Sequence, residues 1–314
     1  MDALDRFAES YLAQWERVST VRSTKRYALT RDVAGEDLFP ARLQPLCDTP
    51  AVAALGPEGR RYVLIQTCLR FMNETVLLET DVVARLAADL ANRPHRVALS
   101  APVGQVALTI AVDEAYHAFA AREFIGQIRE VSGIEPVDPQ TTCGLALALE
   151  ATLRVTPETL RDDVRVAALC IAENSITAEI LGMTEETPAD NPFHIVSAEH
   201  LVDERRHSGY FRHVLKHYWA GLDEAVREAL GAIVPVFLEH YLPTDIPSAP
   251  AVTMLQAAGV EAGAAECTVR DCFKPIARSE HRMARNVMRL LDQSGLLAHP
   301  PTREALTRAE WIAA

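Results

Sequence analysis

Two five-residue stretches of the chain share one pattern of acidic residues and histidine. Residues 113–117 are Asp-Glu-Ala-Tyr-His, and residues 203–207 are Asp-Glu-Arg-Arg-His. In both stretches Glu and His stand three positions apart, so on a helix they lie on the same face, about one turn from each other. A carboxylate oxygen and an imidazole nitrogen placed in this way can bind one metal ion or two adjacent ones. The repeated Asp-Glu-x-x-His motif therefore predicts a metal site built from helices.

The sequence around the two motifs predicts two successive pairs of helices. Apolar residues recur at intervals of three and four in residues 58–92, which is typical of one long amphipathic helix. A second helix is expected over about 102–132, a third over about 162–181 with Gly182 as its cap, and a fourth over 192–219. The motifs fall on the second and fourth of these helices. Two similar helix pairs in succession are what a four-helix bundle needs.

Shorter helical stretches flank the four long ones. Good helix formers predominate, and we predict further helices over about 143–154, 223–241 and 251–258. A last helix is predicted over 268–297, or from Pro275 if the proline interrupts it. No shift in composition marks a domain boundary. We therefore predict an all-α fold in one domain, residues 1–314, with a bundle at about 60–220 and additional N- and C-terminal helices.

The composition of the 314 residues narrows the classes of partner. The formal net charge is −12, so a nucleic acid would be repelled on average and is not expected to bind. The N-terminus lacks the basic-then-apolar layout of a signal peptide, and no uncharged run approaches membrane-spanning length. The six cysteines are scattered without a Cys-x-x-Cys pair. We therefore expect a cytoplasmic protein with reduced thiols and no membrane partner.

Each motif needs a further carboxylate from the helix that precedes it, as in di-metal carboxylate bundles. The first long helix offers Glu74 and Glu79, and the third offers Glu173 and Glu179. Oxygen and imidazole ligands suit iron or manganese, and thiolates are missing from the pattern. The alternative for such residues is a solvated helix face. Two matching copies on corresponding helices favour the metal site.

The aspartate at the start of each motif has a separate expected role. Asp113 and Asp203 directly precede the glutamates of the two motifs. A metal-bound imidazole usually donates its second N–H to a carboxylate, which also orients the ring. We expect both aspartates to accept such hydrogen bonds, and the alternative is an acidic residue at the surface.

The spacing of the two motifs resembles that of a known enzyme family. The pattern Glu-x(28–37)-Asp-Glu-x-x-His, present twice, is similar to that of the amine N-oxygenases typified by p-aminobenzoate N-oxygenase. Glu79 and Glu173 are separated from their motifs by 33 and 29 residues, inside the family window. Glu74 and Glu179, with 38 and 23 residues, fall outside it. The resemblance covers about residues 60–220 and selects Glu79 and Glu173.

The same family carries an extra histidine one turn before its second Glu-x-x-His. Here it is His200, which falls with Glu204 and His207 within about 60° of helical arc. The resemblance thus implies a ferritin-like bundle with two iron ions (Fe2+/Fe3+). The implied ligands are Glu79, Glu114, His117, Glu173, His200, Glu204 and His207. In the family a basic side chain on a late helix can hold a substrate carboxylate, and Arg278 is the candidate here.

The resemblance also implies the reaction. An amine substrate would be converted to a hydroxylamine, nitroso or nitro product, with O2 as co-substrate. An external reductase or other electron donor would supply electrons, because the chain has no glycine-rich nucleotide motif. A homodimer is also expected. Three alternatives stay open. One is a di-iron protein that hydroxylates or desaturates carbon, or that stores iron; another is a radical-generating reductase subunit using a tyrosine such as Tyr116. The third is a helical interaction protein without metal.

Overall fold

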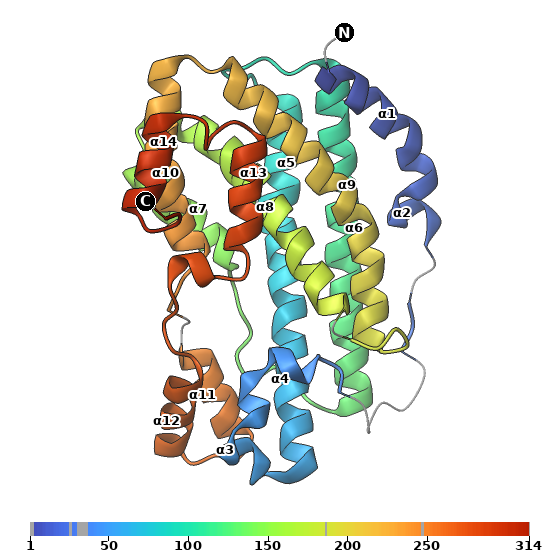
Figure 1. Cartoon of the computed structure of the whole chain (residues 1–314). Helices are drawn as coiled ribbons and strands as arrows, with labels where there is room; N and C mark the ends of the chain where they lie inside the picture. Colours follow the sequence, from blue (N-terminus) through green and yellow to red (C-terminus); the bar gives the residue numbers. More distant parts are fainter. Residues whose placement is uncertain (1–2, 25–26, 30–36, 186, 246–247, 314) are drawn as a thin grey trace.

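The computed structural model describes residues 3–24, 27–29, 37–185, 187–245 and 248–313. Within these residues every regular element is a helix and no strand occurs, so the all-α prediction is confirmed (Figure 1). Four long helical segments run side by side as a ferritin-like bundle. They are α4 (Gly56–Leu78) with its continuation α5 (Ala84–Asn92), α6 (Ala101–Ser132), α8 (Arg161–Glu185) and α9 (Pro192–Gly221).

The first bundle segment contains one turn of π-helix. The sequence predicted a single regular helix over 58–92, and the segment is indeed continuous. Between α4 and α5, however, Glu79–Val83 form a π turn, η3. Single π turns inside α-helices are rare and occur frequently at functional positions. The prediction was correct in extent and wrong in regularity, because a single irregular turn barely disturbs the pattern of apolar residues over so long a segment.

The other long helices differ little from expectation. α8 extends to Glu185, so the predicted cap at Gly182 is wrong: this glycine lies inside the helix. α9 begins at Pro192 as predicted, and the Asn191 side chain caps it by accepting a hydrogen bond from the Phe193 N–H at 2.9 Å. Residues 158–185 are long and apolar enough to cross a membrane, yet 67% of their apolar window is buried inside the protein, as in a core helix.

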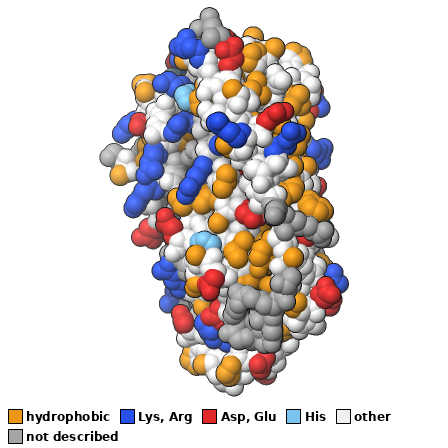
Figure 2. Space-filling model, turned by 90° about the vertical axis from the view of Figure 1, so that its right-hand side faces the viewer, with side chains coloured by type: hydrophobic (Ala, Val, Ile, Leu, Met, Phe, Trp, Pro, Cys, Tyr) orange, Lys and Arg blue, Asp and Glu red, His pale blue; other side chains and the backbone are white. Residues whose placement is uncertain are grey.

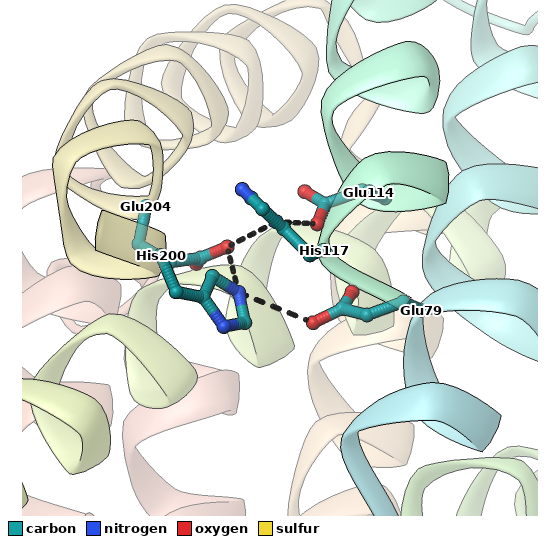
Figure 3. A group of neighbouring side chains, drawn as sticks. All are labelled: Glu79, Glu114, His117, His200 and Glu204. Carbon is teal, nitrogen blue, oxygen red and sulfur yellow. Dashed lines mark hydrogen bonds and ion pairs between the residues drawn. The ribbon is translucent and has the colours of Figure 1, made fainter. Parts of the chain in front are cut away.

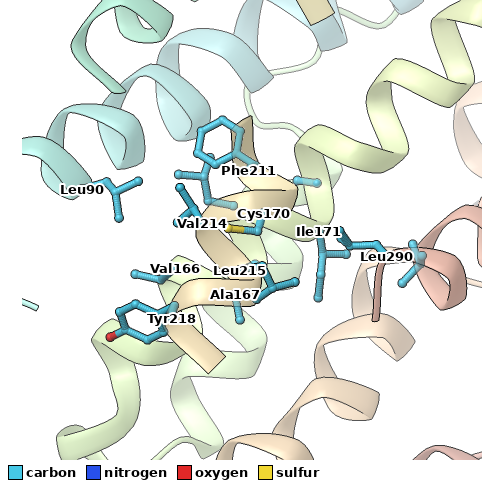
Figure 4. Close-up of a cluster of buried hydrophobic side chains, with 14 of the residues drawn as sticks. Leu90, Val166, Ala167, Cys170, Ile171, Phe211, Val214, Leu215, Tyr218 and Leu290 are labelled. Carbon is cyan, nitrogen blue, oxygen red and sulfur yellow. The ribbon is translucent and has the colours of Figure 1, made fainter. Parts of the chain in front are cut away.

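The long contact between α8 and α9 is apolar at one end of the bundle (Figure 4). Among the labelled side chains of this cluster, those that belong to these two helices are Val166, Ala167, Cys170, Ile171, Phe211, Val214, Leu215 and Tyr218. A second hydrophobic cluster occupies the other end, around α4 and the C-terminal half of α6. On α6 the first cluster ends at Ile110 and the second starts at Ala121. Between these two positions α6 carries three buried polar residues, Asp113, Glu114 and His117.

Shorter helices surround the bundle. α1 (Ala3–Val18) and α2 (Thr20–Ser23) lie along the side formed by α6 and α9, and α3 (Pro50–Ala53), α11 (Ser248–Ala257) and α12 (Ala262–Cys272) gather at the lower end of α4 (Figure 1). α7 (Gly144–Val155), α10 (Glu224–Tyr241), α13 (Ala284–Gln293) and α14 (Pro300–Arg308) cover the opposite side. The predicted helix over 268–297 is wrong, since α12 ends at Cys272 and α13 begins only after Pro275 and the 3-10 turn η5 (Arg278–Glu280).

The side of the molecule that carries α1 and α2 is chemically mixed (Figure 2). Basic side chains concentrate in its upper half, and hydrophobic ones are visible toward its middle. Three large hydrophobic residues of α6 are well exposed: Leu108 (42%), Val112 (47%) and Phe119 (49%). Their spacing of four and seven residues places them on one face of the helix. α6 therefore presents an apolar stripe to solvent.

Candidate metal centre

Seven acidic and histidine side chains meet in the layer between the two hydrophobic clusters. They are the same seven residues that the sequence predicted as metal ligands. The four glutamates are each at most 1% exposed. The residues come from four elements: Glu79 from η3, Glu114 and His117 from α6, Glu173 from α8, and His200, Glu204 and His207 from α9. Their role as metal ligands stays a prediction, but their proximity follows directly from the fold.

The seven residues form two overlapping sets. The first donor group consists of Glu79, Glu114, His117, His200 and Glu204, and Figure 3 shows it. The second donor group consists of Glu114, Glu173, Glu204 and His207. Within each group every residue offers an oxygen or nitrogen atom that lies within 4.8 Å of the others. Glu114 and Glu204 belong to both groups, whereas Glu79 and Glu173 each belong to one.

The shared glutamates lie between the histidines. Glu114 directs one oxygen to the Nδ1 atom of His117, at 2.8 Å, and the other to the Nδ1 atom of His207, at 2.7 Å. The Nε2 atom of His200 lies 3.2 Å from Glu204 and 3.4 Å from Glu79 (Figure 3). A metal ion that binds both carboxylate oxygens and imidazole nitrogens could therefore be held in either group.

Electrostatics favour a cation at this position. Burial, reinforced by the charge of Glu114, raises the pKa of Glu79 to about 8. Burial and the charge of Glu204 likewise raise the pKa of Glu173 well above its usual range. Burial also acts to raise the pKa of Glu114, but His207 and His117 together hold it well below that range. Adjacent buried carboxylates are costly unless cations compensate their charge.

Some buried atoms of the site lack hydrogen-bond partners. They are Glu114 Oε1, Glu173 Oε2 and His207 Nδ1. The 2.7 Å approach of His207 to Glu114 does not have hydrogen-bond geometry, although the two atoms are close. Buried polar atoms without partners are rare and call for an explanation such as a bound ion. Carboxylate oxygens and imidazole nitrogens are suitable donors for iron or manganese.

The two aspartates of the motifs contact the histidines in a crossed arrangement. His207 donates its Nε2–H to Asp113 at 3.2 Å, and His117 donates its Nε2–H to Asp203 at 3.2 Å. Each aspartate thus accepts from the histidine of the other motif, and both are fully buried. Arg206 lies between them and donates to Asp113 at 3.2 Å and also to Asp203. The sequence did not single out Arg206, which occupies a variable position of the motif.

Comparison with known proteins identifies the family. The profile described as p-aminobenzoate N-oxygenase AurF matches residues 9–295. The chain belongs to the AurF family. A 4-aminobenzoate N-oxygenase from Streptomyces thioluteus is 27% identical over 225 residues, which are 71% of this chain and 66% of that enzyme. The aligned part spans just under two thirds of the relative's length. The family predicted from the motifs is confirmed.

The neighbouring glutamates that the AurF-type spacing rejected have other partners. Glu74 accepts hydrogen bonds from the Gly144 N–H at 2.7 Å and from Gln140 at 2.6 Å. Glu179 forms an ion pair with Arg282. Unlike Glu79 and Glu173, neither of these two glutamates belongs to a donor group.

Arg278 lies outside the two donor groups. Its guanidinium donates to the Ala309 carbonyl at 2.8 Å and to Glu239 at 2.6 Å, and its Cζ atom lies 5.8 Å from the centre of the Trp311 ring. These contacts tie η5 to the C-terminal part of the AurF-family chain. Its predicted role in holding a substrate carboxylate stays a prediction.

Two cavities bear on access to the site. A narrow one of about 30 Å³ is lined by His117 and His200, with Phe71, Tyr116 and Glu199 among its walls. A larger one of about 500 Å³ lies further along α4 and α6, and none of the seven predicted ligands lines it. The narrow cavity is therefore the one that adjoins the donor groups. Tyr116, whose proximity to the ligands bears on the radical alternative, lies in its wall.

Proposed function

We propose that this AurF-family protein is an O2-dependent oxygenase that holds two iron ions and oxidises the nitrogen of an amine. The observation that carries the proposal is the pair of donor groups that share Glu114 and Glu204. Paired metal ions in proteins lie roughly 4 Å apart, and two shared carboxylates suit such a pair. Four buried carboxylates would balance the charge of two ferrous ions.

The chain's own residues have three tasks in this proposal. Glu79 and Glu173 would each help to hold one metal, and Glu114 and Glu204 would contribute to holding both. The hydrophobic clusters on either side exclude water from the layer. Iron bound here would supply the activation of O2. The protein contributes position, charge balance and a site that solvent reaches poorly.

The substrate is proposed to approach through the cavity beside His117 and His200, because this cavity adjoins the first donor group. Its volume of about 30 Å³ is small, so side chains such as Phe71 must move for an organic molecule to enter. The relative from Streptomyces thioluteus is named for 4-aminobenzoate, which makes this amine the first substrate to test. Electrons are proposed to come from an external donor.

A homodimer is also proposed. The apolar stripe of Leu108, Val112 and Phe119 on α6 supports it, because a second copy could cover these exposed side chains. Sedimentation of the purified protein would test this, and a monomer at micromolar concentration would contradict it.

The reaction is tested with the iron-loaded protein. Protein made in iron-rich medium should contain two iron ions per chain by elemental analysis. After reduction with dithionite it should be mixed with 18O2 and with 4-aminobenzoate, other aryl amines, alkyl amines or amino acids. The expected product carries the label on nitrogen. A label found only on carbon would indicate a hydroxylase, and oxidised iron released without an organic product would indicate iron storage.

A further inference from the structure

The N-terminal helices supply hydrogen-bond donors to the two buried aspartates. The indole N–H of Trp15, at the end of α1, donates to both oxygens of Asp113 at 3.0 Å, and the Ser19 hydroxyl donates to Asp113 at 2.6 Å. The backbone N–H of Thr20 donates to Asp203 at 3.1 Å, and its hydroxyl donates to the same carboxylate. Ser19 and Thr20 are 0% and 3% exposed.

These hydrogen-bond donors contact the aspartates and do not contact the seven predicted metal ligands directly. The carboxylates of Asp113 and Asp203 accept the Nε2–H of His207 and His117. Because an ionised carboxylate can only accept, it selects the ring form that carries hydrogen on Nε2. The Nδ1 atoms of the same rings then face Glu114. The orientation of each aspartate thus decides which imidazole nitrogen is presented to a metal.

Arg206 alone cannot set the orientation of both aspartate carboxylates. One of its nitrogen atoms donates to both Asp113 and Asp203, so it balances charge between them. Its guanidinium also lies 5.1 Å from the Tyr11 ring of α1. The other hydrogen-bond donors named above come from α1, from α2 and from Ser19 between these two helices. They divide cleanly, with Trp15 and Ser19 on one aspartate and Thr20 on the other.

We propose that Trp15, Ser19 and Thr20 form an N-terminal clamp that positions the metal-binding histidines through the two aspartates. Trp15 and Ser19 act through Asp113 on His207 of the second donor group. Thr20 acts through Asp203 on His117 of the first donor group. The clamp rests on the proposed metal centre, and its residues are positioning residues that touch neither metal nor substrate.

The crossed arrangement gives the clamp a specific test. Zn2+ serves as a diamagnetic probe, because it binds oxygen and imidazole ligands at least as tightly as Fe2+. In the zinc-loaded protein, NMR should resolve slowly exchanging Nε2–H protons of His117 and His207. Thr20→Val should speed the exchange of the His117 proton only, and Ser19→Ala that of the His207 proton only. Each should lower the affinity for one of the two zinc ions by up to about tenfold, the lower end of the loss expected when a ligand's supporting carboxylate is itself removed.

Matched variants separate positioning from general loosening of α1. Thr20→Ser keeps the hydroxyl and should restore the wild-type exchange rate at His117. Ser100→Ala removes a hydrogen bond to Asp5 near the start of α1 and should leave both histidine protons unchanged. Trp15→Phe should reproduce the effect of Ser19→Ala.

Three results would overturn the clamp. They are unchanged exchange in both Thr20→Val and Ser19→Ala, equal changes at both histidines, or the same changes in Ser100→Ala. A wild-type chain that takes up no zinc at the donor groups would instead overturn the metal centre itself, and the clamp with it. That failure is recognised without any variant, so the two proposals can be told apart.

Discussion

The two helix pairs of the bundle contribute the same residue types to the centre but not the same geometry. The first pair, α4–α5 with α6, supplies Glu79 from a π turn, whereas the second pair, α8 with α9, supplies Glu173 from a regular helix. A π turn accommodates one residue more than an α turn and so changes the direction of the side chains within it. The first pair therefore places its single glutamate by a local irregularity that the second pair does not need.

The second difference is the third histidine. His200 belongs to α9 in the second pair, yet its Nε2 lies 3.4 Å from Glu79 of the first pair. It joins the first donor group, which therefore has five residues, while the second group has four. A repeat in sequence has thus produced two unequal groups. If each group holds one metal, five of these side chains would surround the metal in the first group and four would surround the metal in the second.

The largest effect is expected at a residue that both groups share. Glu204→Gln keeps the size of the side chain but removes one negative charge from both groups. We expect the iron content to fall from two ions per chain to close to none. Glu173→Gln changes only the second group and should leave one ion. Elemental analysis of both variants, grown in the same iron-rich medium, measures the difference.

Glu74→Gln is the matched control for these variants. It changes a glutamate of α4 that contacts Gly144 and Gln140 and belongs to neither group. It should keep two iron ions. If Glu204→Gln and Glu173→Gln lose equal amounts of iron, the assignment of Glu204 as the shared residue is wrong.

The sequence singled out the residues that meet in this layer because most of their spacing is local to single helices. Glu and His three positions apart lie on one helix face in any regular helix, so residues 113–117 and 203–207 could be recognised without a structure. The bundle followed from helix lengths and from the order of the pairs. The choice of Glu79 over Glu74 needed the family spacing, since both lie on the same predicted helix.

What the sequence could not predict depends on contacts between distant segments. The aspartates were expected to support histidines, but nothing local indicates that Asp113 pairs with His207 and Asp203 with His117. Ser19 is an ordinary residue in sequence, and only the packing of α1 and α2 against α6 and α9 brings it to Asp113. A π turn also leaves almost no signature in composition.

A smaller effect is expected on removing the third histidine. His200→Ala leaves the first group with four residues, as many as the second, and so removes the inequality between the groups. Loss of a residue that only supports a ligand costs about 10–100-fold in metal affinity, and a direct ligand should cost at least about tenfold. Stepwise titration with Co2+, followed by its visible absorption, should show two affinities that converge in the variant. Unchanged affinities would exclude His200 as a ligand.

The last effect, which leaves every side chain in place, is the dependence of metal binding on pH. Burial and the charge of Glu114 raise the pKa of Glu79 to about 8; burial opposes protonation of His117, but Glu114 and Asp203 raise its pKa to about 10. At pH 7 the Glu79 carboxyl and the His117 imidazole therefore each hold a proton that a metal must displace. Affinity should rise with pH from 6 to 8, by at most about tenfold per pH unit for each proton released. Calorimetry in buffers of different ionisation enthalpy counts these protons.

Glu79→Gln is the control for this count. The variant should release one proton fewer when the first donor group fills with metal, and the same number when the second donor group fills. An affinity that does not depend on pH would show that the buried carboxylates and histidines are not the ligands.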